Sequence, residues 1–409
     1  MANILILNIT IPYPLHYNGN TLRVLPLSRE LAKHHRCYLA AFGEVDERYH
    51  ELVEHHEYDD ILLLPPIPAQ LPWWRHLFWR TGNLIKRLHP VYYRDCVIKL
   101  TTFANRHHID LVLAHTMIAS EFAEQLPVAG KIVDTIDSRH LYLERRYTNQ
   151  HSTDKKLPGR LKAKRELARA HYQESRLLSH FEVATTISSR DSSTLRELTG
   201  ASEGQVYDIP NGVTPELEQW DNTGTPPGRA IAFWGALDFP PNATAVSYFY
   251  EQVFLPYLSK ADVFWYIIGR NPGADIYTMA KRHQQIIVTG YVPDLFSVVR
   301  GIPIVVNPML IGGGLKNKVL EAFAMQRAVV SNALGMEAID ATPDKHYLPA
   351  ETPGEFAAQI LALLDDRVLA QNIGDEARKM VLESYTWSAI GQKMNELVNH
   401  CIKQPQNPS

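Results

Sequence analysis

Residues 308–324 read Pro308-Met309-Leu310-Ile311-Gly312-Gly313-Gly314-Leu315-Lys316-Asn317-Lys318-Val319-Leu320-Glu321-Ala322-Phe323-Ala324. An apolar run precedes this stretch and a helical pattern follows its glycines, which predicts a strand, a tight turn and a helix. The N-terminus of such a helix attracts phosphate through its unpaired N–H groups, and Lys316 and Lys318 add positive charge there. No Lys-Ser or Lys-Thr follows the last glycine at the Walker spacing, which argues against an ATP- or GTP-hydrolysing machine. The glycines alone are equally compatible with a plain turn.

Short apolar runs alternate with longer helical patterns along the whole chain, as in parallel sheets with crossover helices. The predicted strands are Ile4–Ile9, Tyr38–Phe42, Ile61–Leu64, Leu111–Ala114, Lys131–Asp134, Val183–Ile187, Val206–Ile209, Ala230–Trp234, Val263–Ile268, Gln285–Val288, Ile302–Val306 and Ala328–Ser331. They predict two doubly wound α/β units in series.

The length of 409 residues also predicts two domains. A polar stretch rich in Gly and Pro at 221–228 leaves no room for a buried element, so we place domains at 1–218 and 229–384, with a linker at 219–228. Helical patterns run through 355–383, and a last one, from 387 to 401, follows a break at Tyr385-Thr386.

Composition excludes several classes of protein. The chain is 45% hydrophobic with a net charge of −3, which argues against a disordered chain and against a general nucleic-acid binder. Cys37, Cys96 and Cys401 are too few and too scattered for a disulfide framework or a metal knuckle, which predicts a reduced, cytoplasmic setting. The apolar start lacks a basic segment, and no uncharged apolar run is long enough for a spanning helix.

The run from Gly314 to Ala324 resembles the nucleotide-sugar site of family 4 glycosyltransferases of the GT-B fold. The resemblance is closest to the bacterial branch that builds exopolysaccharides and other surface glycans. Four more stretches match that family: Phe233-Trp234-Gly235-Ala236-Leu237-Asp238 leading into Pro241-Asn242, Ile268-Gly269-Arg270-Asn271-Pro272, Val288-Thr289-Gly290-Tyr291-Val292-Pro293-Asp294, and Ile209-Pro210-Asn211-Gly212-Val213.

The resemblance implies two Rossmann-like domains that face a central cleft. The first would bind a glycan or lipid-linked acceptor, the second a nucleotide-diphosphate sugar as donor substrate, with no further cofactor. Residues 385–409 would form a helix that returns to the first domain. The implied reaction is sugar transfer with retention of the anomeric configuration.

The resemblance also implies site residues. Glu321 matches the carboxylate that accepts hydrogen bonds from the ribose hydroxyls, and Lys318 and Arg270 would neutralise the diphosphate. Gly235 and Gly314 would let the backbone approach the phosphates. Leu315 and Lys316 belong to the same turn, and Tyr291 would lie beside the nucleobase.

The sequence departs from the family at two positions. The family's first motif acid should stand eight residues before Glu321, where this chain has Gly313. This leaves the donor sugar open and admits a second reading, a non-catalytic scaffold with the same fold. A third reading, a sugar-nucleotide epimerase of this fold, needs additional acids and histidines. The other departure, Gln326 in place of a glycine, reads as a loop variation of little consequence.

In the first half, Asn18-Gly19-Asn20 with Arg23 resembles the family's glycine loop, which lies across the cleft from the diphosphate. His115 ends a predicted strand where the family often carries a histidine that faces the donor sugar. Such a histidine suits hydrogen bonding or proton transfer, so we count it as a catalytic candidate with Lys318 and Glu321. Asp134 and Asp137 end the next strand, where they would either orient the acceptor or cap a helix.

No Asp-x-Asp triplet occurs in the chain. Glycosyltransferases of the other major fold use that pair to hold a divalent metal, so a metal-independent reaction without a metal site is expected here.

Two stretches of the first half are basic. Residues 71–106 hold seven Lys and Arg against one acid, interleaved with Trp73, Trp74, Phe78 and Trp79, and residues 155–176 hold eight against two. The tryptophans are compatible with core packing, with docking on an anionic membrane surface, or with contact to an anionic acceptor. We therefore expect a cytoplasmic protein, peripheral on the inner face of the membrane if the second alternative holds.

Overall fold

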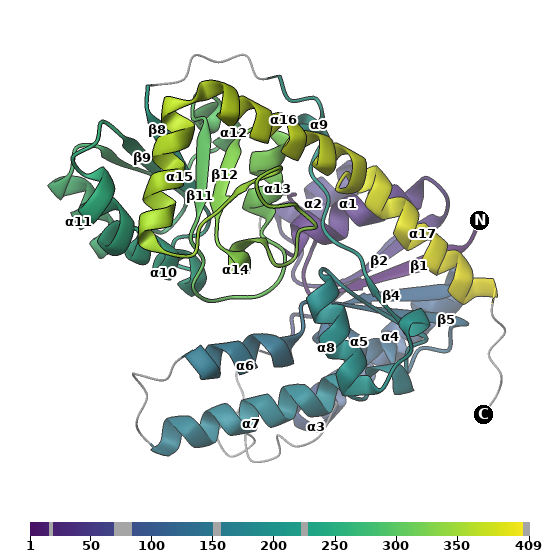
Figure 1. The fold of residues 1–409 in the computed structure, drawn as a ribbon. Coiled ribbons are helices and arrows are strands. Elements are labelled where there is room, and N and C mark those ends of the chain that lie inside the picture. The colour runs from purple at the N-terminus through teal and green to yellow at the C-terminus, as the bar shows by residue number, and fades with distance from the viewer. Residues whose placement is uncertain (16–18, 69–83, 150–156, 222–227, 404–409) are drawn as a thin grey trace. The chain divides into compact units, whose positions relative to one another are not determined.

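The computed structural model describes residues 1–15, 19–68, 84–149, 157–221 and 228–403. They form two compact units, Met1–Asn211 with Trp387–Ser409, and Gly212–Thr386 (Figure 1). The first unit ends at 211 rather than at the expected 218 because the segment after it packs in the second unit. There, Arg378 donates hydrogen bonds to the carbonyl oxygens of Leu217 and Glu218, at 3.0 and 2.8 Å.

The first unit is built on a seven-stranded parallel sheet of order β3-β2-β1-β4-β5-β6-β7. Its strands are β1 (Asn3–Asn8), β2 (Arg36–Phe42), β3 (Ile61–Leu64), β4 (Leu111–His115), β5 (Gly130–Ile136), β6 (Val183–Thr186) and β7 (Val206–Asp208). Its helices are α1 (Thr21–Ala32), α2 (Glu47–Glu54), α3 (Leu84–Leu88), α4 (Pro90–Arg106), α5 (Met117–Ala123), α6 (Arg139–Asn149), α7 (Leu157–Glu174), η2 (Leu177–Ser179), α8 (Ser189–Thr199), η3 (Glu203–Gln205) and α17 (Trp387–Lys403).

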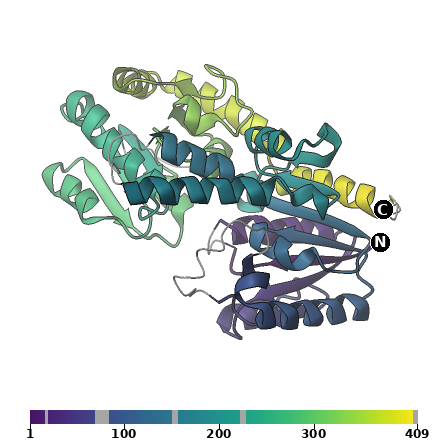
Figure 2. The ribbon, with the colours of Figure 1, turned by 90° about the horizontal axis from the view of Figure 1, so that it is seen from below.

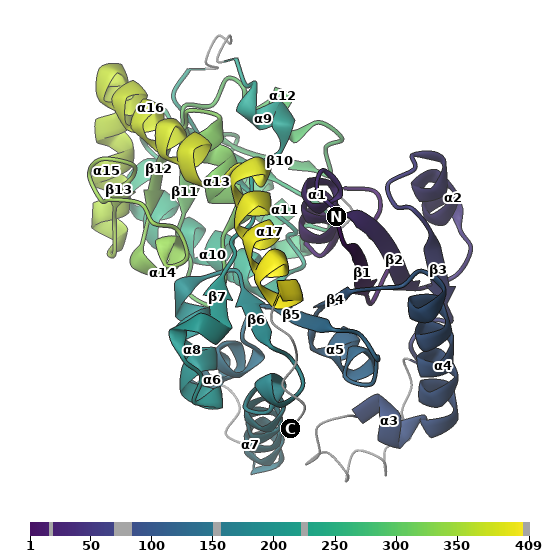
Figure 3. The same cartoon turned by 90° about the vertical axis from the view of Figure 1, so that its right-hand side faces the viewer.

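Helices cover both faces of this sheet because its strands alternate apolar side chains to two separate cores. One core includes residues of α1 and α17, and the other includes residues of α4 and α5. Figures 2 and 3 show α17 on one side of the sheet and α4 on the other. A Cβ at Gly391 of α17 would lie 2.3 Å from the Cβ of Glu30, so only glycine permits this approach to α1.

The second unit is built on a six-stranded parallel sheet of order β10-β9-β8-β11-β12-β13. Its strands are β8 (Ala230–Trp234), β9 (Phe264–Ile268), β10 (Ile286–Gly290), β11 (Ile304–Asn307), β12 (Ala328–Ser331) and β13 (Leu348–Pro349). Its helices are α9 (Pro215–Glu218), α10 (Pro240–Tyr248), the π-helix η4 (Phe249–Leu258), α11 (Ala274–Arg282), α12 (Leu295–Val299), α13 (Asn317–Ala324), α14 (Ala333–Met336), α15 (Pro353–Asp365) and α16 (Arg367–Ser384).

All twelve predicted strands are present, and β13 is an addition. Both units are Rossmann-like, because each sheet is parallel and its order reverses once, between β1 and β4 and between β8 and β11. Ligands of such sheets bind at the carboxyl ends of the strands beside that reversal. Among the helices in the described ranges, none has both the length and the apolar character to cross a membrane.

Candidate functional site

Glycine turns follow the strands on either side of the reversal in the second sheet. Gly235 follows β8 with a φ of +150°, and Gly314, after β11, has a φ of +66°. Gly269, after the neighbouring β9, has a φ of +149°, and a Cβ there would lie 1.8 Å from the carbonyl oxygen of Gly235. The backbones of two turns are therefore in contact at this edge, which no other residue type allows.

We expect Gly269→Ala to lower the free energy of unfolding of the second unit by about 3 kcal/mol, from the positive φ and the overlap with the Gly235 oxygen. Chemical denaturation measures the change. Gly354→Ala is the matched control, because Gly354 lies in α15 with no atom closer than 3.9 Å to an added Cβ. It should change stability by about 1 kcal/mol or less, in the stabilising direction. Equal losses in the two variants would contradict the close approach.

Lys318 is a buried cation beside the glycine turn. It lies in the first turn of α13, its Nζ donates a 2.7 Å hydrogen bond to Asn242 Oδ1, and the same Nζ lies 3.8 Å from the centre of the Phe233 ring. Burial, reinforced by the charge of Lys316 and partly opposed by Glu321, lowers the pKa of Lys318 to about 7. An amide and an aromatic ring solvate this ammonium without neutralising it, so an anion would gain from binding here.

Lys316 closes the turn on itself. Its Nζ donates hydrogen bonds of 2.8 Å to the carbonyl oxygens of both Gly313 and Gly314, and the residue is 9% exposed. The sequence shows the positive charge but not this use of it. Lys316 therefore braces the glycine turn and, through its charge, contributes to the depressed pKa of Lys318.

Glu321 lies three residues after Lys318, on the same face of α13. Its Oε2 accepts a 2.7 Å hydrogen bond from the indole Nε1 of Trp234, the last residue of β8. The sequence shows Trp234 only as one residue of a family motif and does not reveal this role. An aromatic residue with a single N–H donor at a strand end is the signal that would have pointed to it.

The remaining predicted residues of this half occupy different positions. Leu315 is buried within the turn. Arg270 is exposed directly after Gly269, and its carbonyl oxygen accepts a 3.0 Å hydrogen bond from the Leu237 N–H. Tyr291 is 72% exposed after β10, two strands from β8. The structure thus brings the turn, Lys318 and Glu321 together, and leaves Tyr291 at the edge of the sheet.

Gln326 is more than a neutral loop variation, contrary to the expectation from sequence. Its φ is +57°, the left-handed region that favours glycine. Its side-chain Nε2 donates a 2.8 Å hydrogen bond to Asp375 Oδ1.

In the first unit, Arg23, Asp134 and His115 form a buried network beside the reversal between β1 and β4. Arg23 donates from Nε and Nη2 to the two carboxylate oxygens of Asp134, at 2.7 and 2.8 Å, and all three side chains are fully buried. Burial alone would raise the pKa of Asp134, but the charge of Arg23 and the hydrogen bonds from His115 and Arg23 hold it well below its usual range. Asp134 therefore does not cap a helix, contrary to one of the two expectations, and its carboxylate oxygens are bonded to Arg23 and His115. Asp137 is exposed.

His115 has one ring nitrogen engaged and one open. Its Nδ1 lies 2.8 Å from Asp134 Oδ2, whereas Nε2 is buried without a hydrogen-bond partner among the described residues. Because the ionised Asp134 can only accept, Nδ1 donates to it, and Nε2 is the ring nitrogen left for a ligand. This arrangement suits a hydrogen bond with a hydroxyl group. Gly19 precedes α1 after β1, and nothing lies within 4 Å of a Cβ built there.

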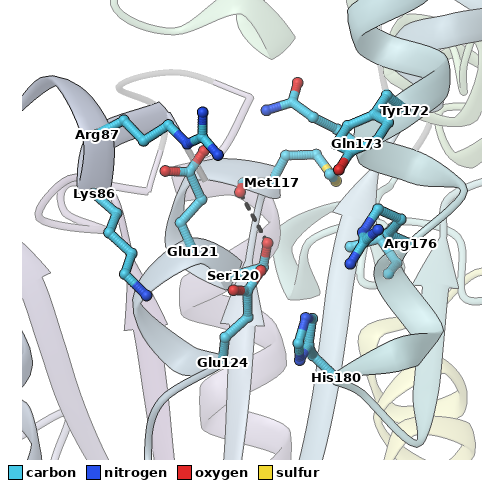
Figure 4. Close-up of a pocket in the computed structure, with 11 residues that line it drawn as sticks. Lys86, Arg87, Met117, Ser120, Glu121, Glu124, Tyr172, Gln173, Arg176 and His180 are labelled. Atoms are coloured by element: carbon cyan, nitrogen blue, oxygen red, sulfur yellow. Dashed lines mark hydrogen bonds between the residues drawn. The ribbon is translucent and has the colours of Figure 1, made fainter. Parts of the chain in front are cut away.

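A cavity of about 480 Å³ opens in the first unit between α3, α5 and the end of α7. Figure 4 shows Lys86 and Arg87 on one side and Arg176 and His180 on the other. Glu121 of α5 and Glu124, directly after that helix, lie between them. Cations and carboxylates alternate here. Lys86 and Arg87 come from the basic stretch 71–106, whose tryptophans lie outside the described residues, as do the side chains at the start of the stretch 155–176.

Within the described residues of the chain, no group of three or more His, Cys, Asp and Glu is placed to hold a metal ion. No curated protein sequence matches the chain. Residues 228–366 match the family model described as glycosyl transferases group 1.

Several solved structures are similar over the whole length. Sucrose-phosphate synthase from Thermosynechococcus elongatus has a TM-score of 0.67 at 14% identity and covers 98% of this chain and 99% of its own. HepE from Anabaena in complex with UDP-glucose has a TM-score of 0.64 at 13% identity, with 98% and 100% covered. A TarM variant from S. aureus in complex with fondaparinux, α-GlcNAc-glycerol and UDP has a TM-score of 0.67 at 11% identity, with 99% and 100% covered.

These likenesses, at identities of 11 to 14%, establish the fold. The chain has the two-domain GT-B fold, residues 228–366 match the glycosyl transferases group 1 family, and the two findings together support sugar transfer as its activity.

Proposed function

We propose that this protein transfers a sugar from a nucleotide-diphosphate sugar to a glycan or lipid-linked acceptor, with retention of configuration and without a metal ion. The observation that carries the proposal is the buried Lys318 ammonium, solvated by Asn242 at a glycine turn one helical turn from Glu321. The diphosphate of a donor would supply a counter-charge to this ammonium, and Glu321 would accept from the ribose hydroxyls. UDP and UDP-glucose bind to HepE, which has this fold.

In the proposed reaction the acceptor hydroxyl oxygen attacks the anomeric carbon as the bond from that carbon to the phosphate oxygen breaks. The departing phosphate takes the hydroxyl proton on the same face, so no protein nucleophile is needed. Lys318, Arg270 and backbone N–H groups would stabilise the charge that develops on the diphosphate. His115 would form a hydrogen bond through Nε2 with a hydroxyl of the transferred sugar.

Incubation with UDP-, GDP-, ADP- and dTDP-sugars tests the proposal through nucleotide release and thermal stabilisation. A donor at a hundredfold excess over its Kd should stabilise the protein by about 2.7 kcal/mol. Stabilisation without turnover over a range of acceptors would favour the scaffold reading, which Gly313 at the first motif position supports. No stabilisation by any nucleotide sugar would contradict the proposal.

Glu321→Ala should weaken binding of the nucleotide at least about tenfold, because one carboxylate accepts from two ribose hydroxyls. The 2′,3′-dideoxy nucleotide lacks those hydroxyls, so it should bind the wild-type protein and the variant equally. Calorimetry with both nucleotides measures the difference. If the Glu321→Ala variant still bound the ordinary nucleotide more tightly than the dideoxy nucleotide, Glu321 would not be the group that contacts the ribose hydroxyls. Glu383→Ala, at an exposed position of α16, serves as the control.

The cellular location and the role of the reaction product are part of the same proposal. We place the protein in the cytoplasm of a bacterium, in the synthesis of surface polysaccharide or glycoconjugate, with peripheral membrane contact through residues 71–106. Changing Arg75, Arg80, Lys86 and Arg87 to Glu should abolish sedimentation with vesicles that contain anionic lipid. Unchanged sedimentation would remove the membrane from the proposal.

A further inference from the structure

The second unit has a cavity of about 260 Å³. It lies at the amino-terminal ends of the strands, whereas the glycine turns lie at their carboxyl ends. It is lined by residues that directly precede three strands: Arg229 precedes β8, Pro303 precedes β11 and Arg327 precedes β12. The end of α15 and the start of α16 complete its wall. Since the strands are parallel, the length of the strands separates this cavity from the candidate donor site at their carboxyl ends.

Positive charge dominates this cavity. Four arginines line it, Arg229, Arg300, Arg327 and Arg367, and no aspartate or glutamate is among the lining residues. Arg229 forms an ion pair with Asp365 at the rim, where both side chains are partly exposed. The other cavity, in the first unit, differs because carboxylates alternate with its cations.

Arg327 is the buried member of the cluster. It is 5% exposed, its Nη2 donates a 2.6 Å hydrogen bond to the Arg300 carbonyl oxygen, and its Nε has no hydrogen-bond partner among the residues that the structure describes. Within the described part of the chain no carboxylate forms an ion pair with it. Burial, together with the charge of Arg300, lowers the pKa of Arg327 to about 10. A buried guanidinium with an unpaired donor is costly unless an anion joins it.

Arg378, an arginine of this unit with a structural role, differs from Arg327 in the number of its hydrogen bonds. Arg378 of α16 donates to the carbonyl oxygens of Leu217, Glu218 and Ala324, and so ties together elements far apart in the sequence. Arg327 makes one such bond. The guanidinium carbons of Arg300 and Arg327 lie 4.7 and 5.9 Å from the centre of the Trp220 ring. Contact with an aromatic ring stabilises a cation but does not neutralise its charge.

We propose that this cavity binds the phosphate group of a small phosphorylated molecule. Guanidinium groups match phosphate oxygens through paired N–H donors. The volume is several times the roughly 30 Å³ that a water molecule occupies in the liquid, so it accommodates the phosphate together with part of the body attached to it. The site does not rest on the proposed transferase activity, since the donor site lies at the other edge of the sheet.

Inorganic phosphate, titrated into the full chain with UDP present to occupy the donor site, tests the proposal. Phosphate should raise the melting temperature more than sodium chloride at equal ionic strength, and should change the fluorescence of Trp220. Arg367→Ala, at an exposed position that is expected to leave folding intact, should raise the Kd for phosphate about tenfold. Arg300→Ala should do the same, and Arg282→Ala, an exposed arginine of α11, should not.

Two results would overturn the site: stabilisation by phosphate that sodium chloride reproduces, or equal phosphate affinity in the Arg367→Ala, Arg300→Ala and Arg282→Ala variants. Lys318→Ala separates this site from the donor site, because that variant should keep its phosphate affinity in the absence of UDP. Failure of every nucleotide sugar to bind would leave the phosphate result unaffected.

Discussion

Lys318→Gln should abolish the pH dependence of donor binding. In the wild-type protein the pKa of Lys318 is about 7 before the donor binds. Above pH 7 most Lys318 side chains are neutral, so donor binding requires Lys318 to take up a proton. The phosphates of a nucleotide sugar stay ionised throughout this range, so the affinity should fall about tenfold for each pH unit between pH 7.5 and 9.

The variant has no titrating group at this position, so its affinity should be uniformly low. At pH 6.5 it should bind the donor at least about thirtyfold more weakly than the wild-type protein, the loss of one buried charge-assisted hydrogen bond of about 2 kcal/mol. Calorimetry at four pH values, with the best-binding nucleotide sugar of the panel, measures both effects.

Lys379→Ala is the control, because Lys379 is exposed on α16 and should keep the wild-type profile. A profile in Lys318→Gln as steep as that of the wild-type protein would show that another group takes up the proton. Low affinity with an unchanged slope would therefore contradict the role of Lys318 as the phosphate-binding cation.

The largest stability effect is expected at the pair of Arg23 and Asp134. Arg23→Met should lower the free energy of unfolding by about 3–5 kcal/mol, because it leaves the Asp134 carboxylate buried without its counter-ion. It also removes the hydrogen bonds to the Ile209 carbonyl oxygen and to Asn211 Oδ1, at 2.8 and 3.0 Å, which hold the loop after β7. Denaturant unfolding of the first unit measures the loss.

Arg29→Met, in the same helix, is the control. Arg29 pairs with Glu57 at the surface with 47% of its side chain exposed, and an exposed pair contributes about 0–1 kcal/mol. The double variant Arg23→Met with Asp134→Leu should recover part of the loss, because no charge is then stranded. A double variant as unstable as the sum of the single ones would show that shape, not charge, explains the effect of Arg23.

The strands and the spacing of the site could be read from the sequence because they depend on local order along the chain. Apolar runs between helical patterns predicted every strand but β13, whose two residues are too few for a pattern and owe their state to pairing with β12. The separation of Lys318 and Glu321 by three residues placed both on one face of a helix.

The partners of these residues depend on contacts between distant segments. Asn242 bonds to Lys318 across 76 positions and Trp234 bonds to Glu321 across 87, so no local pattern revealed that the lysine is only partly charged or that the carboxylate is oriented. Likewise, the sequence shows Asp134 only as a carboxylate at the end of a strand, because its partner Arg23 lies 111 positions away in the chain.

Sequence order was thus sufficient for the α/β class, the two parallel sheets and the position of the glycine turn before a helix, because hydrophobic periodicity and backbone conformation are properties of neighbouring residues. The protonation of Lys318, the ionisation of Asp134 and the gathering of four arginines at one sheet edge were decided only by the tertiary structure. A pKa depends on burial and on nearby charge, and folding brings both from segments that are remote in the chain.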